Sequence, residues 1–241
     1  MDVRACVRVN ITMPEKDVMA SAIQYQGRQA RRQGSEQRRR AILEAALRII
    51  VREGIRAVRH RAVAKEADVP LSATTYYFKD ISDLIADAFT LFAEQAMTEV
   101  IGPFRDQAFA LLDSFNASSF SDDAQRDRMI DLLTEMTTAF IVSEVTDKRD
   151  HLVAEQAFLH EAVLDERLRE LANTYRNSQL EVLTAACEKF GSKAPALDAE
   201  LVMAAFYRVE YELLVSGEAP DPARVSPPVR HALDMVVGHG Q

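Results

Sequence analysis

The apolar positions of this chain recur at helical spacing over most of its length. In the segment from 35 to 54, the apolar residues fall at i, i+3, i+4, i+7 and i+8, which is typical of one face of an amphipathic helix. They are Ile42, Ala45, Ala46, Ile49 and Ile50. Ser35 or a neighbouring residue is a candidate N-cap for this helix, and Gly54 is a candidate left-handed cap at its end.

Two short helical patterns follow, separated by a turn. The first covers 60–67, and Asp68-Val69-Pro70 ends it, because proline disfavours helix at the residue before it. Pro70 suits the first turn of the second pattern, which covers 70–78.

In this second short helix, Leu71, Thr74 and Phe78 are spaced to face inward. A longer amphipathic helix is predicted over 81–101. Two short helices joined by a three-residue turn, with a longer helix on each side, predict a helix-turn-helix.

The remainder of the chain is predicted to be a helical body. The predicted breaks in it are Gly102-Pro103, a polar stretch near 115–123, Lys148-Arg149, Lys193-Ala194-Pro195 and the segment from Pro220 to Pro228. The candidate helices cover 104–116, 122–145, 149–165, 166–190, 197–216 and 226–237. No strand alternation competes with them, and the predicted fold class is all-α.

Composition supports this fold class and restricts the setting. The 241 residues include only 8 Gly and 8 Pro, below the usual share of about 7% and 5%, which argues against turn-rich β folds. Cys6 and Cys187 are too few for a disulfide framework or a four-thiolate zinc site. No stretch reaches the roughly 18 apolar residues of a membrane span, and the first residues do not resemble a secretory signal. We therefore expect a cytoplasmic protein with no membrane partner.

Charge is distributed unevenly around a net value of −8. Residues 26–66 hold 12 Lys and Arg against 4 Asp and Glu, whereas residues 67–241 hold 14 against 30. A basic segment joined to an acidic body is typical of a part that faces a polyanion.

The stretch GIRAVRHRAVAKEADVPLSATTYYFKDISDL at 54–84 resembles the N-terminal DNA-binding domain of tetracycline-repressor (TetR) family regulators. The resemblance extends over about 36–90. The chain departs from the family pattern at three positions: Asp68 replaces the usual turn glycine, Arg59 replaces a capping Thr or Ser, and Thr75 replaces a common tyrosine.

The resemblance implies a ligand-responsive, homodimeric repressor that binds a palindromic operator in double-stranded DNA and is released by a small effector. Residues 1–34 show no periodicity and end in an arginine-rich polar run, so we expect a flexible basic tail there. With the resemblance, the remainder is expected to form a helix-turn-helix DNA-binding domain (35–80) and a helical ligand-binding and dimerisation domain (81–241). The alternative is an architectural or adaptor helix-turn-helix protein without an effector.

The second short helix has a small, polar outward face suited to the major groove: Ser72, Ala73, Thr75 and Tyr76. Arg61 is the candidate for a bidentate contact to guanine. By resemblance, the contacts to phosphates come from Arg59, Thr75, Tyr77 and Lys79.

Each of these assignments has an alternative. Tyr76 and Tyr77 could instead pack against the first helix, and Arg59 and Arg61 could be solvated charges. The arginines of the tail and of the first helix are further candidates for phosphate or minor-groove contacts, or else a solubilising arm: Arg28, Arg31, Arg32 and Arg38–Arg40.

The helical body supplies candidates for a ligand pocket and for a dimer interface. The pocket candidates are apolar or aromatic residues with isolated polar neighbours, although such residues more often form core. They are Phe92, Met97, Met136, Phe140, His151, Glu155, Phe158, Tyr175, Phe206 and Tyr207. The absence of Trp and the few strong charges on these faces favour an apolar effector. The dimer interface is expected on helices 166–190 and 197–216, because the second has an apolar face too wide for a lone surface helix.

Catalytic and metal-binding motifs are absent from the sequence. The five histidines, His60, His151, His160, His231 and His239, show no metal-ligand spacing, and there is no phosphate-binding glycine loop or nucleophile elbow. We expect no enzyme activity, no cofactor and no metal.

Overall fold

The computed structural model describes residues 25, 27, 33–115 and 122–238, and within these ranges it contains helices and no strands. The first elements are α2 (Gln33–Glu53), the 3₁₀ turn η1 (Ile55–Ala57), α3 (His60–Glu66), α4 (Leu71–Tyr77) and α5 (Ile81–Gln95). A π-helical turn, η2 (Ala96–Ile101), joins α5 to α6 (Gly102–Asp113). The later helices are α7 (Asp123–Asp147), α8 (Arg149–Glu161), α9 (Glu166–Lys189), α10 (Pro195–Ser216) and α11 (Pro222–Gly238).

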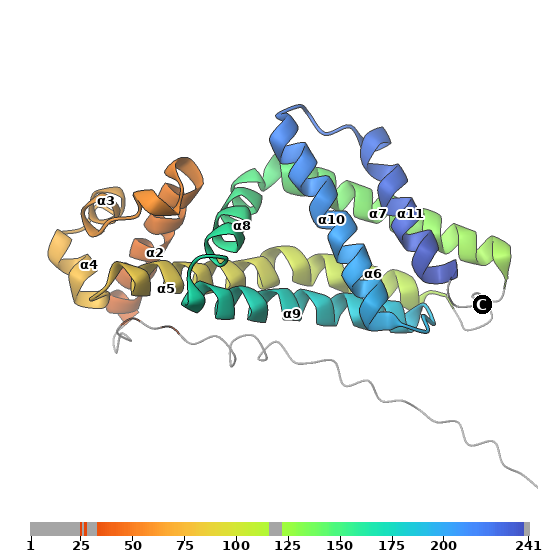
Figure 1. The fold of residues 1–241 in the computed structure, drawn as a ribbon, viewed down its shortest axis with the longest axis horizontal. Coiled ribbons are helices and arrows are strands. Elements are labelled where there is room, and N and C mark those ends of the chain that lie inside the picture. Colours follow the sequence, from red (N-terminus) through yellow and green to blue (C-terminus); the bar gives the residue numbers. More distant parts are fainter. Residues whose placement is uncertain (1–24, 26, 28–32, 116–121, 239–241) are drawn as a thin grey trace, which may run out of the picture.

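The helices form an elongated molecule (Figure 1). Helices α2, α3 and α4 make one end, which we call the head, and α7, α10 and α11 lie toward the other. Helix α5 leaves the head and runs along the molecule beside α9, while α11 packs on α7 and α10 on α9. None of the described helices is long and apolar enough to cross a bilayer.

The head has the predicted helix-turn-helix. Asp68 takes the left-handed conformation in the turn, with φ 51°, which Asp tolerates better than most residues. Gly54 also has a positive φ, of 82°, at the end of α2. Asp80 caps α5, since its carboxylate accepts from the Ser82 N–H at 3.0 Å.

Two details of the head were predicted wrongly. Leu71 is 42% exposed rather than turned inward, because it lies in the first turn of α4, while Thr74 and Phe78 are buried as expected. Ser35 lies inside α2 rather than capping it, since the helix already begins at Gln33.

The predicted break at Gly102-Pro103 is also wrong, because the helical path continues from α5 through η2 into α6. Pro103 has no N–H and so interrupts the usual hydrogen-bond ladder. The wider π turn absorbs this defect, with the Gly102 N–H donating to the Met97 carbonyl. A Cβ atom at Gly102 would lie 2.8 Å from that carbonyl oxygen, so the close approach requires glycine.

Only the first residues of the segment from Pro220 to Pro228 separate α10 from α11. Helix α11 begins at Pro222, four residues before the predicted start of 226, and holds Pro227 and Pro228 inside it. Asp221 supplies its N-terminal cap by accepting from the Ala223 N–H at 2.9 Å.

Two hydrophobic cores hold the molecule together. The first joins the head to the body: Ile42 and Phe78 belong to the same buried cluster as Phe89 of α5, Phe158 of α8 and Tyr175 of α9. The second core lies between α7, α9, α10 and α11. The first core therefore crosses the predicted domain boundary between residues 80 and 81.

Candidate nucleic-acid interface and ligand cavity

Helix α4 presents a polar, accessible face at the end of the molecule. Ser72, Thr75 and Tyr76 are exposed and Ala73 is half-buried, while Thr74 is fully buried. The buried side anchors the helix on the head, so that the opposite face is free to approach a groove.

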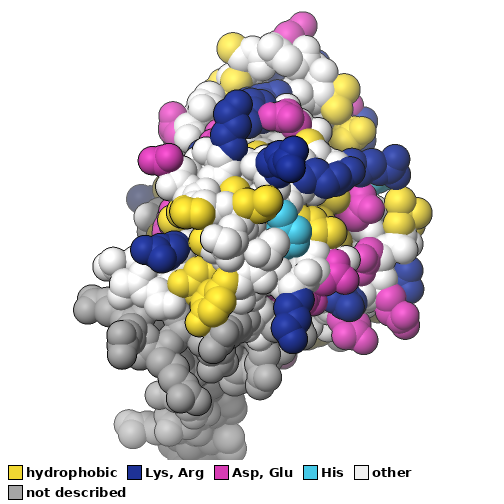
Figure 2. All heavy atoms as spheres, turned by 90° about the vertical axis from the view of Figure 1, so that its left-hand side faces the viewer, with side chains coloured by type: hydrophobic (Ala, Val, Ile, Leu, Met, Phe, Trp, Pro, Cys, Tyr) yellow, Lys and Arg dark blue, Asp and Glu magenta, His cyan; other side chains and the backbone are white. Residues whose placement is uncertain are grey.

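Basic side chains surround this face. Figure 2 shows Lys and Arg side chains on this end of the molecule, among apolar, uncharged and acidic ones. Arg59, Arg61 and Lys79 are all exposed, and no ion pair links any of them to another described residue. Arg59 donates to the carbonyl of its neighbour Val58 at 2.8 Å. An exposed guanidinium without a carboxylate partner is available to a phosphate or a base edge.

Tyr77 differs from the other predicted DNA contacts because its side chain is only 5% exposed. Its hydroxyl lies 2.8 Å from the Ser35 hydroxyl of α2, and its ring meets the Tyr76 ring edge-to-face at 5.1 Å. In this structure Tyr77 therefore packs against the first helix, which was the alternative for this residue. A phosphate contact through its hydroxyl stays a prediction.

The three arginines of the first helix that are candidates for contacts with DNA differ in their exposure. Arg39 is buried and pairs with Asp87 of α5 at 2.6 Å, so it is not available to DNA, while Arg38 and Arg40 are exposed. Arg40 pairs with Glu44 at 2.9 Å. The tail arginines, Arg28, Arg31 and Arg32, lie outside the described residues.

A cavity of about 830 Å³ of empty space, part of it open to solvent, lies in the body. Its walls come from η2, α6, α7, α8, α9 and α10, and they are mostly apolar. Phe104 of α6 and Phe140 of α7 stack at 4.2 Å between ring centroids on one side of it. A largely apolar cavity with a few polar groups in its wall is typical of sites for small organic ligands.

Six of the residues predicted from sequence line this cavity: Phe140, His151, Glu155, Tyr175, Phe206 and Tyr207. Phe92, Met97, Met136 and Phe158 do not line it. Phe92 and Phe158 are buried in the first core, and Met97 and Met136 pack against the two cores, where aromatic and thioether side chains at helical spacing commonly lie.

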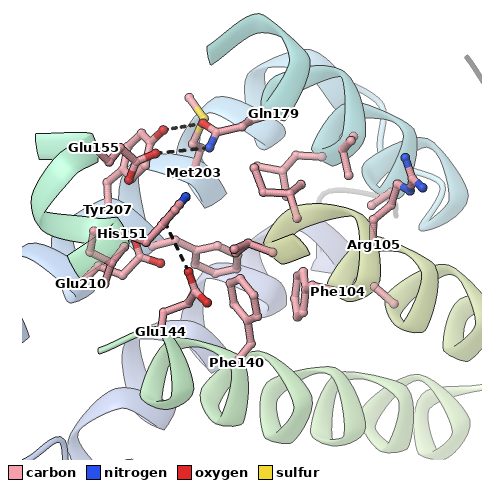
Figure 3. Close-up of a pocket in the computed structure, with 18 of the residues that line it drawn as sticks. Phe104, Arg105, Phe140, Glu144, His151, Glu155, Gln179, Met203, Tyr207 and Glu210 are labelled. Carbon is pink, nitrogen blue, oxygen red and sulfur yellow. Dashed lines mark hydrogen bonds and ion pairs between the residues drawn. The ribbon is translucent and has the colours of Figure 1, made fainter. Parts of the chain in front are cut away.

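Three buried carboxyl groups line one side of the cavity (Figure 3): those of Glu144, Glu155 and Glu210. Glu155 accepts from the Tyr175 hydroxyl at 2.8 Å, and Glu144 lies 3.2 Å from Nζ of Lys148. The sequence analysis expected few strong charges on these faces, and this cluster shows that the expectation was wrong.

Burial shifts the titration of these groups. Desolvation raises the pKa of Glu155 to about 7 and raises the pKa of Glu210 well above its usual value. It also raises the pKa of Glu144, although Lys148 opposes that change. Burial lowers the pKa of His151 to about 4, so the imidazole is neutral at pH 7 and both its nitrogens lie buried without a hydrogen-bond partner.

His151 connects the cavity to α5. Its ring stacks on Phe92 of α5 at 4.6 Å between centroids, while its other side lines the cavity. An occupant that moves His151 would therefore act directly on the helix that carries the head.

Glu144, Gln179 and Glu210 were missed by the sequence analysis. The signal that could have found the two glutamates is their register: Glu144 continues the buried series Ile130, Leu133, Thr137 and Ile141, and Glu210 follows Met203 and Phe206 at helical spacing. A carboxylate at a core position of an amphipathic helix is unusual and commonly marks a site. Among the described residues there is no group of His, Cys, Asp and Glu side chains that could hold a metal ion.

Two family models match the chain. Residues 42–88 match the model described as bacterial regulatory proteins of the tetR family, and residues 124–239 match a tetracyclin repressor-like C-terminal domain. Together the two matches account for well over half of the chain, and they fall on the head with α5 and on the body. No curated protein matches the chain.

Solved structures share the fold. A TetR-family member from Streptomyces coelicolor A3 is 22% identical with a TM-score of 0.54, over 83% of this chain and 97% of that one. The multidrug binding protein EbrR, solved with proflavin, is 22% identical with a TM-score of 0.53, over 83% of this chain and 99% of its own. A putative regulator from Saccharomonospora viridis, solved with choline, is 18% identical with a TM-score of 0.59, over 85% of this chain and 97% of its own.

Proposed function

Because the chain belongs to the TetR family of bacterial transcription regulators, we propose that it is a homodimeric repressor that binds a palindromic operator and is released by a small effector. The effector enters the cavity of the body. The observation that carries the proposal is the polar face of α4, exposed beside Arg59, Arg61 and Lys79 at one end of a molecule whose other part holds a cavity.

The DNA contacts divide into two kinds. Ser72, Ala73, Thr75 and Tyr76 approach base edges in the major groove, where methyl groups and hydroxyls can meet thymine methyls and hydrogen-bonding edges. Arg61 reads guanine, while Arg59, Thr75, Tyr77 and Lys79 hold phosphates and so set the position of the head.

Pairing of two chains is supported by the outer face of α10. Six of its exposed residues recur at intervals of four and three, which is the spacing of a helix–helix seam. They are Leu197, Leu201, Ala204, Arg208, Tyr211 and Val215, and we call them the α10 stripe. Arg208 of the stripe pairs with Glu212 beside it, so the charge of Arg208 is compensated within the same helix.

Release follows from a change in the spacing of the two heads. A dimer reads two half-sites only if its recognition helices are separated by about 34–36 Å or a multiple of that distance. An occupant that favours another orientation of α5, through His151 and Phe92, moves the heads out of register. The occupant shifts this equilibrium only as far as it binds the two states unequally.

Selection of DNA by the full chain from a random-sequence pool tests this function. We expect enriched sequences with an inverted repeat, and a ratio of specific to non-specific affinity that stays large as added salt weakens both. Enrichment without symmetry, or a specificity that disappears together with affinity, would instead favour an architectural protein.

A further inference from the structure

The three buried glutamates of the cavity differ in the partners that they have. Glu144 has the Lys148 ammonium at 3.2 Å, and Glu155 has the Tyr175 hydroxyl at 2.8 Å and the Gln179 amide at 3.5 Å. Glu210 is only 7% exposed and lines the cavity, yet it makes no hydrogen bond or ion pair with any described residue. A buried carboxyl group without a partner is costly to keep, and its remaining neighbour is the empty space.

We propose that the effector is an organic cation with an apolar body, and that Glu210 pairs with its positive charge inside the cavity. This inference rests on the proposed function, because it names the chemical class of the effector of the same cavity. It replaces the apolar effector expected from the sequence.

The rest of the cavity suits such a ligand. The stacked rings of Phe104 and Phe140 offer an apolar wall that can also attract a cation through its π face. The glutamates come from α7, α8 and α10 and lie together on one side of the view, with Arg105 on the other (Figure 3). Arg105 is paired with Asp106 at 2.8 Å, so its charge is already compensated. Anions would meet three carboxyl groups and are disfavoured.

The groups that face Glu210 determine how binding depends on pH. They are Glu144 with Lys148, His151 and Glu155 of α8, Tyr175 of α9 and Tyr207 on its own helix. His151 is neutral at pH 7, and Lys148 is engaged by Glu144. Burial, and then the neighbouring carboxylates, raise the pKa of Glu210, so its carboxyl group keeps its proton to a higher pH than an exposed glutamate does.

Wherever Glu210 holds its proton, a permanent cation must displace that proton when it pairs with the carboxylate. In that pH range the bound state holds fewer protons than the empty state, so the affinity for the cation rises with pH, by up to about tenfold per unit for one proton released. A neutral ligand of the same shape displaces no proton and shows no such rise.

Titration calorimetry with two isosteric probes tests the inference on the full chain. Phenyltrimethylammonium carries a permanent charge that does not itself titrate, and tert-butylbenzene is its neutral carbon isostere. At pH 8 we expect the cation to bind at least about tenfold more tightly, with the difference narrowing toward pH 6. Equal affinities, a cation affinity that does not change with pH, or no measurable binding of the cation would overturn the proposal.

The variant Glu210→Gln separates pairing from packing. It keeps the shape of the side chain and should bind tert-butylbenzene as the parent does while losing the preference for the cation. Glu200→Gln, an exposed glutamate on the same helix, is the matched control and should leave both affinities unchanged. A preference that survives in Glu210→Gln contradicts the assignment.

Operator binding is measured in parallel with the same variants. Intact operator binding together with a failed cation preference overturns the effector class alone. Loss of selective DNA binding in the parent protein overturns the proposed function instead.

Discussion

At the scale of single residues, the proposed recognition of bases depends most on Arg61. It is exposed at the start of α3 and has no ion pair with a described residue. If it makes a bidentate contact to guanine, Arg61→Ala costs about 1–3 kcal/mol per half-site and relaxes discrimination at one base pair.

Quantitative binding to a set of single-base operator variants measures this effect. Arg61→Lys should not restore the lost discrimination, because an ammonium group cannot make the planar two-pronged contact. A loss of affinity of equal size on every operator variant would show that Arg61 contacts a phosphate and not a base.

Glu155 gives a residue-scale prediction about stability. Its pKa rises from 4.5 to about 7 on folding because the carboxyl group is desolvated. A raised folded pKa means that the native state binds the proton more tightly, so the contribution of Glu155 to stability is fully present below pH 4.5 and is lost as pH rises through about 7.

Glu155→Gln should remove this dependence, which amounts to about 3 kcal/mol between the two ends of the window. Urea unfolding at pH 5, 6, 7 and 8 measures it, with exposed Glu200→Gln as the control. A parent and a Glu155→Gln protein with parallel pH curves would show that Glu155 is not the group that titrates.

At the scale of elements, the buried ion pair between α2 and α5 fixes the head on the helix that carries it. Arg39 and Asp87 lie 2.6 Å apart, and both are almost fully buried. The Gly27 N–H also donates to Asp87 at 2.8 Å, and the Arg39 guanidinium lies 4.3 Å from the Tyr25 ring centroid.

Asp87→Ala should destabilise the protein by about 3–5 kcal/mol, because it leaves the Arg39 charge buried without its partner. The double variant Arg39→Met with Asp87→Leu should recover most of that loss, since apolar side chains of similar volume avoid the desolvation cost. Chemical denaturation of the single and double variants measures both effects. Glu44→Ala, which breaks the exposed pair with Arg40, is the control and should cost no more than about 1 kcal/mol.

Most elements could be predicted from sequence because their apolar spacing and capping residues are local signals. The pattern around Asp68 located the helix-turn-helix, and the predicted body helices agree with α7 through α10 to within a few residues. The path through Gly102 and Pro103 could not be predicted, because the π turn that tolerates the proline depends on a non-standard hydrogen bond to Met97.

The cavity was predicted only in part, for a related reason. Spacing identifies which residues face inward, but it does not separate a cavity wall from a packed core, so Phe92 and Phe158 were grouped with Phe140 and Phe206. The carboxyl cluster arises where α7, α8 and α10 meet, and no single helix carries that information.

At the scale of the whole molecule, the α10 stripe leads to a prediction about assembly. Leu201→Glu with Tyr211→Glu places like charges on both sides of the proposed two-fold axis and should give a monomer. Operator affinity should then fall by about a hundredfold or more, since two linked heads bind far better than one.

Analytical ultracentrifugation and operator binding measure the two outcomes. Val163→Glu is the matched control, because Val163 is 70% exposed but lies between α8 and α9, away from the stripe. A double variant that stays dimeric would exclude the stripe as the pairing surface.

The core shared between head and body limits how this regulator can be recombined with others. Phe78 of the head lies in the same buried cluster as Phe89, Phe158 and Tyr175, and Arg167 of α9 reaches Asp83 of α5 at 3.0 Å. In a chimera joined at residue 80, the transplanted DNA-binding domain would pack against the α5, α8 and α9 of another protein. The apolar surfaces of the two parts would then not match. Exchange of DNA specificity therefore requires substitutions confined to the outer face of α4. The other route is to transfer the head together with α5 and the surfaces of α8 and α9 that pack against it.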